Sequence, residues 1–106
     1  MKKIEIGLKE KIHFIGIGGI GMSGLAQVMK TMGFKVQGSD LLNSKNVERC
    51  KKNGIKVFKS HSRENIKDST VIVKSSAVKN NNPEIKEAKK QKINILKMAE
   101  MLAHVV

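Results

Sequence analysis

The sequence predicts an α/β domain in which helices cover both faces of a parallel β-sheet. Short apolar runs of strand length alternate with stretches whose apolar residues recur at helical spacing. A glycine cluster, Gly16 to Gly24, separates the first such run from the first helical stretch. Right-handed crossovers place the helices of such a chain on both faces of the sheet. We therefore expect a Rossmann-like three-layer sandwich with about five parallel strands.

The glycine cluster joins the first strand, expected at Lys11–Ile17, to a helix expected at residues 20–32. Its pattern Gly16-x-Gly18-x-x-Gly21 matches a diphosphate-binding fingerprint. In that fingerprint the first glycine makes a tight turn, the second lets the backbone approach a diphosphate, and the third lets helix and strand pack closely. Free N–H groups at the start of the helix would hold the anion. A glycine turn with only a structural role remains the alternative.

The remaining elements follow from apolar spacing and from capping residues. Further strands are expected at residues 35–38, 55–58, 70–73 and 94–96, and further helices at residues 45–53, 83–90 and 98–106. Asn43 and Ser44 are both suitable N-caps for the second helix, and Asn82 with Pro83 marks the start of the third. Residues 1–10 alternate apolar and charged side chains, which fits either an added edge strand or a loose lead-in.

Polar loops follow the first four expected strands. Ligands bind outside the carboxyl ends of the strands in such sheets, so these loops should line one crevice. They are Gly16–Gly24, Ser39–Asp40, Ser60–His61 and Ser75–Ala77. Asp40 lies about twenty residues beyond the glycine cluster, where dinucleotide-binding domains carry a carboxylate for a ribose hydroxyl.

Composition limits the other function classes. The chain has 106 residues, the size of one domain, and a net charge of +12. A basic nucleic-acid-binding domain is disfavoured because the lysines are spread along the chain, only Arg49 and Arg63 are arginines, and no Tyr or Trp is available to stack on bases. No apolar stretch is long enough for a membrane span, and we expect a cytoplasmic protein.

Cysteine and histidine usage predicts neither a disulfide nor a metal site. Cys50 is the single cysteine, which fits a reducing compartment, and we expect it to be a half-buried helix residue. His13, His61 and His104 are scattered, with no second ligand at metal spacing. We therefore expect no metal in this chain.

From Lys11 onwards the chain resembles the N-terminal domain of the Mur ligase family, and within it the ligases that join L-alanine to UDP-N-acetylmuramate. The matching segments are His13–Gly24, Gly38–Asp40, Ser75–Ala77, Asn82–Glu84 and Ala99–Leu102. The resemblance implies that residues 11–106 form a Rossmann-like domain that binds the UDP moiety of UDP-N-acetylmuramate. It also implies a longer enzyme of peptidoglycan synthesis that uses ATP and Mg²⁺.

The resemblance also implies a role for each matching residue. Gly18, Gly19, Ile20, Gly21 and Met22 should face the diphosphate, Ser39 and Asp40 should lie by the ribose or uracil, and His61, Ser75, Ser76 and Ala77 should close the uridine pocket. The family's Gly-Lys-Thr phosphate loop belongs to the next, ATPase domain and does not occur here. We therefore expect the chain to bind UDP-N-acetylmuramate without catalysing, and to partner that ATPase domain.

Two residues depart from the family pattern. Ser60 stands where many members carry glycine before the loop histidine, and Met98 stands where we expect arginine. Any family contact of that arginine is therefore in doubt here. Without the longer pattern, an NAD-binding module of a dehydrogenase or a redox-sensing regulator would fit equally well, because Asp40 suits the ribose of NAD too.

Overall fold

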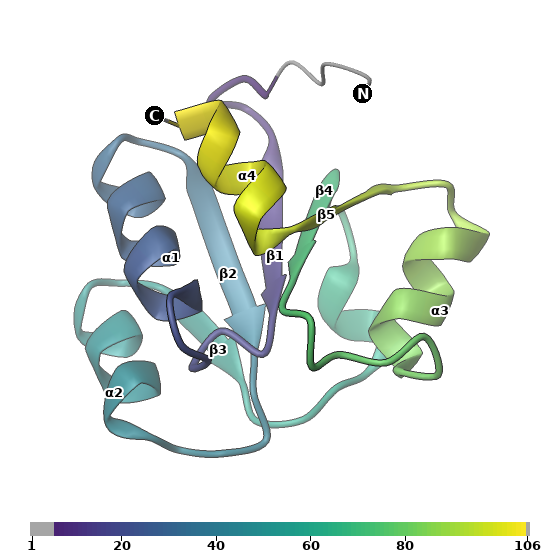
Figure 1. Cartoon of the computed structure of the whole chain (residues 1–106), viewed down its shortest axis with the longest axis horizontal. Coiled ribbons are helices and arrows are strands. Elements are labelled where there is room, and N and C mark those ends of the chain that lie inside the picture. The colour runs from purple at the N-terminus through teal and green to yellow at the C-terminus, as the bar shows by residue number, and fades with distance from the viewer. Residues whose placement is uncertain (1–5, 106) are drawn as a thin grey trace.

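The computed structural model describes residues 6–105, which form a five-stranded parallel sheet (Figure 1). The strands are β1 (Lys11–Ile15), β2 (Lys35–Ser39), β3 (Lys56–Phe58), β4 (Val71–Lys74) and β5 (Asn94–Lys97). Their order is β3-β2-β1-β4-β5, so the chain first moves outwards from β1 to β3 and then returns to β4 on the other side. This reversal places a topological switch point between the carboxyl ends of β1 and β4.

Helices cover both faces of the sheet, which confirms the Rossmann-like three-layer sandwich. One face carries α1 (Met22–Thr31), α2 (Lys45–Lys52) and α4 (Met98–Val105), and the other carries α3 (Pro83–Lys90) with a 3₁₀ segment, η1 (Arg63–Ile66). No helix within residues 6–105 is both long and apolar enough to cross a membrane.

The central strands alternate between the two apolar cores. Ile12 and Phe14 of β1 are fully buried against the face of α1, whereas Ile15 packs towards α3. A strand covered on both faces reads as a continuous apolar run, which is why β1 and β4 were recognisable as strands. His13 is the exception in β1, because it is a fully buried polar residue directed to the α3 face.

Capping residues set the helix ends. Ser44 is the N-cap of α2, where its hydroxyl accepts from the N–H of Val47 at 3.2 Å, and Asn82 caps α3 through the N–H of Glu84 at 2.8 Å. Gly33 follows α1 with a φ of 101°, the left-handed conformation typical of a C′ glycine. The α1 helix begins at Met22, later than expected, because Gly21 takes a left-handed conformation and serves as its N-cap.

Two segments differ from expectation or go beyond it. Residues 63–66 form a 3₁₀ helix, where the sequence predicted neither a strand nor a helix. In the lead-in, residues 6–10 form a turn in which the N–H of Glu10 donates to the carbonyl of Gly7 at 3.0 Å, while residues 1–5 lie outside the described part. Cys50 is more buried than expected, and this burial raises the pKa of its thiol.

Candidate functional site

The glycine loop lies against the carboxyl end of β2. Gly16 leaves β1 with a φ of 76°, and the N–H groups of Gly16 and Ile17 both donate to the carbonyl of Ser39, at 2.8 and 3.1 Å. The N–H of Gly19 then returns to the carbonyl of Gly16 at 2.9 Å. These bonds fold the loop into a compact turn in front of α1.

Gly18 is the point of closest approach between this loop and the start of α2. A Cβ atom at Gly18 would lie 2.8 Å from Val47 Cγ2 and 2.9 Å from both Asp40 Oδ2 and Ser44 Oγ. The N–H of Gly18 donates to Asp40 Oδ2 at 2.8 Å, and Asp40 Oδ1 accepts from the N–H of Leu42 at 2.9 Å. Asp40 therefore ties the glycine loop to the loop that follows β2.

The N-terminus of α1 presents unpaired amides. Within residues 6–105, no hydrogen-bond acceptor is found for the N–H groups of Ile20, Gly21, Ser23 and Gly24. The first turn of α1 contains no acidic side chain, and the Ile20 side chain at the loop tip is 97% exposed. Free amides combined with the positive end of a helix dipole favour an anion at this position.

Met98 lies beside this helix end. Its sulfur would be 2.8 Å from a Cβ atom at Gly21, and its half-buried side chain packs on the core shared by α1 and α4. The position where the resemblance suggested arginine is therefore taken by a thioether that contacts the glycine loop. Beside the N-terminus of α1, the chain therefore has an apolar contact where an arginine would place a positive charge.

The loop after β4 faces the glycine loop across the switch point. A Cβ atom at Gly16 would lie 3.9 Å from Ser75 Oγ and 3.7 Å from Val78 Cγ2, in ordinary contact. Ser75 is half-buried, whereas Ser76 and Ala77 are exposed. The two loops predicted to share a crevice are thus neighbours, with Asp40 on the other flank of the glycine loop.

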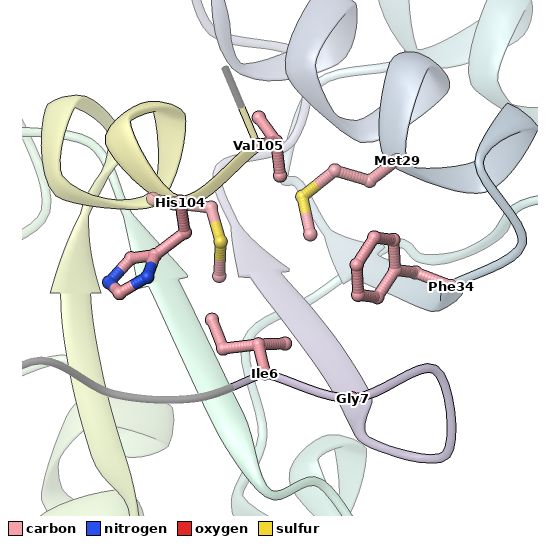
Figure 2. Close-up of a pocket in the computed structure, with 7 residues that line it drawn as sticks. Ile6, Gly7, Met29, Phe34, His104 and Val105 are labelled. Carbon is pink, nitrogen blue, oxygen red and sulfur yellow. The ribbon is translucent and has the colours of Figure 1, made fainter.

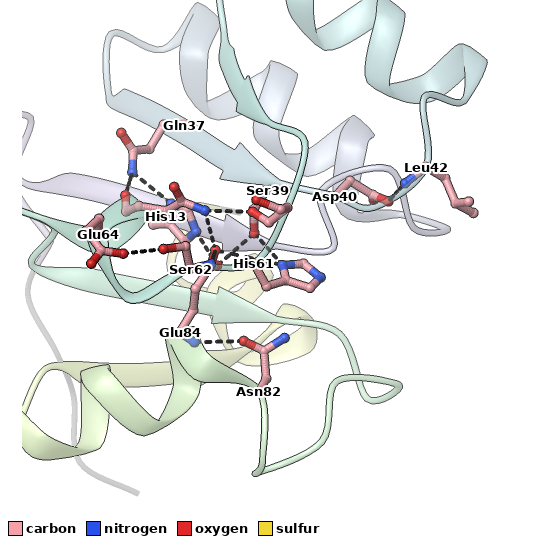
Figure 3. Close-up of polar contacts among 12 residues, drawn as sticks. His13, Gln37, Ser39, Asp40, Leu42, His61, Ser62, Glu64, Asn82 and Glu84 are labelled. Carbon is pink, nitrogen blue, oxygen red and sulfur yellow. Dashed lines mark hydrogen bonds and ion pairs between the residues drawn. The ribbon is translucent and has the colours of Figure 1, made fainter.

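A buried polar cluster lies behind this edge, on the face of α3 (Figure 3). Its centre is the fully buried carboxylate of Glu84, which accepts hydrogen bonds from four donors on three segments. The donors are His13 Nε2 at 2.7 Å, Ser39 Oγ at 2.7 Å, Asn65 Nδ2 at 2.8 Å and the N–H of Ser62 at 3.1 Å. Burial alone would raise the pKa of Glu84, but the hydrogen bonds from His13, Ser39 and Asn65 outweigh it and lower the pKa.

Hydrogen bonds within the same cluster determine which ring nitrogen of His13 donates and which accepts. The side-chain NH₂ of Gln37 donates to His13 Nδ1 at 2.7 Å and to the carbonyl of Asn65 at 2.6 Å. Because His13 Nδ1 accepts, the ring proton is on Nε2, which donates to Glu84. Both ring nitrogens of this core histidine are therefore hydrogen-bonded.

Ser39 and His61 lie between this cluster and the carboxyl edge of the sheet. Ser39 is fully buried, and its hydroxyl lies 2.9 Å from His61 Nδ1. The His61 side chain is 17% exposed. Of the residues predicted by resemblance, Asp40 and the loops at Gly18–Met22 and Ser75–Ala77 surround the switch point, whereas Ser39 and His61 lie on the α3 side.

Sequence reasoning did not single out His13, Gln37, Asn65 or Glu84 as a group. A signal was present in part, because His13 and Gln37 are polar residues inside buried strand runs, and the two stand opposite each other in the β1–β2 register. Asn65 and Glu84 come from segments whose contact with these strands depends on the tertiary fold.

The molecule also contains a cavity of about 430 Å³ at the opposite end of the sheet, between α1, α4 and residues 6–7 (Figure 2). It is lined by Ile6, Gly7, Met29, Phe34, Met101, His104 and Val105. None of these residues belongs to the four loops predicted to line one crevice at the carboxyl edge of the sheet. In the described part of the chain, no three His, Cys, Asp or Glu side chains gather in a way that could hold a metal ion.

Residues 11–106 match the model of the family described as "Mur ligase family, catalytic domain". A UDP-N-acetylmuramate-L-alanine ligase of Pelagibacter ubique is 60% identical over 98% of this chain and 22% of the relative, and one of Rickettsia typhi is 54% identical over 90% of this chain and 19% of the relative. This chain therefore spans about a fifth of the length of these curated relatives.

Solved structures show the same architecture. UDP-N-acetylmuramate-alanine ligase MurC of Thermotoga maritima superposes with a TM-score of 0.85 at 36% identity, over 90% of this chain and 22% of that one. Shikimate dehydrogenase of Aquifex aeolicus gives a TM-score of 0.58 at 22% identity, over 90% of this chain and 45% of that one, a likeness of fold alone.

Proposed function

Because this chain belongs to the Mur ligase family, we propose that the crevice at the carboxyl edge of its sheet binds the UDP moiety of UDP-N-acetylmuramate. The observation that carries the proposal is the row of unpaired amides where the glycine loop enters α1. A diphosphate is the part of this ligand that such amides and a helix N-terminus bind.

The unpaired amides narrow the contact with the diphosphate to part of the glycine loop. The N–H groups of Gly18, Gly19 and Met22 are used within the protein, by Asp40, Gly16 and Gly19 respectively. We therefore assign the diphosphate to the amides of Ile20 and Gly21 and the first turn of α1. Gly18 then acts as the residue without a side chain that lets the loop close on Asp40.

The nucleoside contacts are assigned to the flanking loops. Asp40 is half-buried and can accept from a ribose hydroxyl in addition to its two backbone donors. Ser75, Ser76 and Ala77 border the crevice opposite Asp40, and His61 borders it on the α3 side. Ser39 is buried, so its proposed part is to hold His61.

For the whole protein we propose the activity named for its relatives, ligation of L-alanine to UDP-N-acetylmuramate. The energy source would be ATP with Mg²⁺, held by an ATPase domain in the remaining four-fifths of the relatives' length. Residues of this chain do not fit that group, because the sequence has no Gly-Lys-Thr loop and residues 6–105 bring no acidic cluster together. The role proposed for this domain is substrate binding.

Calorimetric titration of the 106-residue chain tests the proposed ligand. UDP and UDP-N-acetylmuramate should bind, and NAD should give no heat at the same concentration. Heat with NAD and none with UDP would instead identify a dinucleotide-binding module. A gel shift of duplex DNA that weakens steeply with salt would identify the nucleic-acid alternative.

Ile20 supplies a matched pair of variants for the diphosphate position. Its side chain is 97% exposed, so substitutions there leave the core intact. Ile20→Asp places a carboxylate beside the bound diphosphate and should weaken UDP binding about tenfold more than the neutral Ile20→Asn, with the difference shrinking at high salt. Equal affinities of the two variants would contradict the assignment of the diphosphate to this helix end.

A further inference from the structure

We propose that His61 meets the nucleoside as a hydrogen-bond acceptor, and that Glu84, acting through Ser39, is the positioning residue that keeps it in this state. The inference rests on the proposed function for the identity of the ligand. Its basis in the protein is the set of hydrogen bonds that ends at the buried Glu84 carboxylate.

The two neighbours of the Ser39 hydroxyl determine which of them accepts its proton. Ser39 Oγ lies 2.7 Å from Glu84 Oε1, and a carboxylate can only accept, so the hydroxyl proton is donated to Glu84. Towards His61 Nδ1, at 2.9 Å, Ser39 Oγ is then an acceptor. His61 must therefore carry its proton on Nδ1.

A neutral imidazole protonated on Nδ1 has a lone pair on Nε2. Nε2 has no hydrogen-bond partner among the residues that the structure describes, and Figure 3 shows it on the side of the ring away from Ser39. In its neutral form, the partly exposed His61 therefore offers an acceptor to the ligand; Glu84 Oε2 lies 3.8 Å from its Nδ1, on the same side as Ser39.

Glu84 also holds the loop that carries His61. The N–H of Ser62 and the side-chain amide of Asn65 both donate to Glu84 Oε2, at 3.1 and 2.8 Å. The Asn65 amide donates in addition to the carbonyl of Ser60 at 2.7 Å. The residues on both sides of His61 are thereby fixed to one buried carboxylate on α3.

An acceptor at Nε2 selects ligands that carry a donor at the matching place. In uridine the candidates are the imide N3–H of uracil and the ribose hydroxyls. Cytosine has an acceptor at its N3 and would leave Nε2 without a partner if the imide is the contact. A polar group left unpaired in a binding site is the usual reason for strong discrimination.

Nuclear magnetic resonance tests the protein side without any ligand. In the ¹⁵N-labelled chain at neutral pH, long-range ¹H–¹⁵N correlations should show His61 protonated on Nδ1 and His13 on Nε2, with exposed His104 as the reference. Ser39→Ala, and independently Glu84→Gln, should remove the Nδ1 preference of His61 while backbone spectra show the folded domain. A proton on Nε2 of His61 in the unsubstituted chain would overturn the proposal.

Ligand analogues test the nucleoside's contact with His61 Nε2. They also distinguish the uracil imide from the ribose hydroxyls as the donor. N3-methyl-UDP tests the imide, and 2′-deoxy-UDP and 3′-deoxy-UDP test the hydroxyls. One of the three should bind about tenfold more weakly than UDP, as expected for one lost hydrogen bond, and His61→Ala should abolish that difference. If all analogues bind as UDP does, the inference fails and the proposed function stands; if UDP itself does not bind, both fail.

Discussion

At the scale of single residues, Gly18 shows how one position can serve the fold and the site together. Its amide is bound by Asp40, and its Cα lies where a side chain would collide with Asp40, Ser44 and Val47. The glycine fingerprint is usually explained by the approach of a diphosphate. In this molecule the same glycine is already required by the packing of the loop on α2.

Gly18→Ala should therefore lower stability as well as UDP affinity. Overpacking of this kind costs about 1 to 3 kcal/mol of unfolding free energy. Gly24→Ala is the matched control, because a Cβ there meets nothing within 4 Å, and alanine should stabilise α1 by about 0.5 to 1 kcal/mol. Urea denaturation of both variants checks this, and equal stability would contradict the close contact at Gly18.

At the scale of elements, β2 is joined to the glycine loop by a second close approach. A Cβ atom at Gly38 would lie 2.7 Å from Ile17 Cδ1 and 2.8 Å from the carbonyl oxygen of Phe14. The carbonyl is part of the neighbouring strand β1 and cannot move without disturbing the pairing of Phe14 with Gly38. Gly38 thus allows Ile17 to fold over the end of the sheet.

Gly38→Ala should be among the most damaging small substitutions in the chain. We expect a loss of about 3 kcal/mol, at the upper end for overpacking, because both obstructing groups belong to β1 and the turn that follows it. Thermal unfolding followed by circular dichroism measures the effect. Gly54→Ala provides a comparison at a site with space but a φ of 83°, where the cost comes from backbone strain alone.

Most elements were predictable because local signals agreed with the fold. The strands and helices lie within a few residues of their expected positions, since capping residues such as Ser44, Asn82 and Gly33 act through short-range bonds. The exceptions, the late start of α1 and the 3₁₀ segment, depend on a left-handed Gly21 and on burial of Ile66 under α3. Neither can be read from apolar spacing.

The candidate site was predictable in a similar way. The rule that polar loops gather at the carboxyl ends of parallel strands correctly made the glycine loop a neighbour of Asp40 and Ser75, whereas their contacts with a ligand stay a prediction. The resemblance to the Mur ligase family is confirmed. What sequence could not provide was the direction of each side chain. Ser39 and Asp40 are adjacent in sequence but point to opposite faces of the sheet, towards Glu84 and towards Gly18.

At the scale of the whole molecule, the Glu84 cluster links stability to pH. Its donors come from β1, β2 and the η1 region, and Glu84 itself lies in the first turn of α3. One carboxylate therefore connects four segments on this face of the sheet. The pKa of Glu84 is lowered below its ordinary value of 4.5. The stabilisation is therefore complete above that value and is lost as the pH falls through the lower, folded-state pKa.

Urea unfolding of the chain and of Glu84→Gln between pH 7 and pH 3 measures this link. At pH 7 the variant should be less stable by about 1 to 3 kcal/mol, because a glutamine cannot accept from all the donors. The difference between the two proteins should shrink below pH 4.5, where the carboxylate of the unsubstituted chain begins to bind a proton. A constant difference across the range would assign the acid sensitivity to other groups.

The strand order also affects self-association, because it decides which strands form the edges of the sheet. The two outer strands, β3 and β5, have three and four residues, and each bears a lysine, Lys56 and Lys97. Short edges with positive charges are a common protection against strand-to-strand aggregation. With a net charge of +12 adding mutual repulsion between copies, the sheet has little tendency to extend from one molecule into the next.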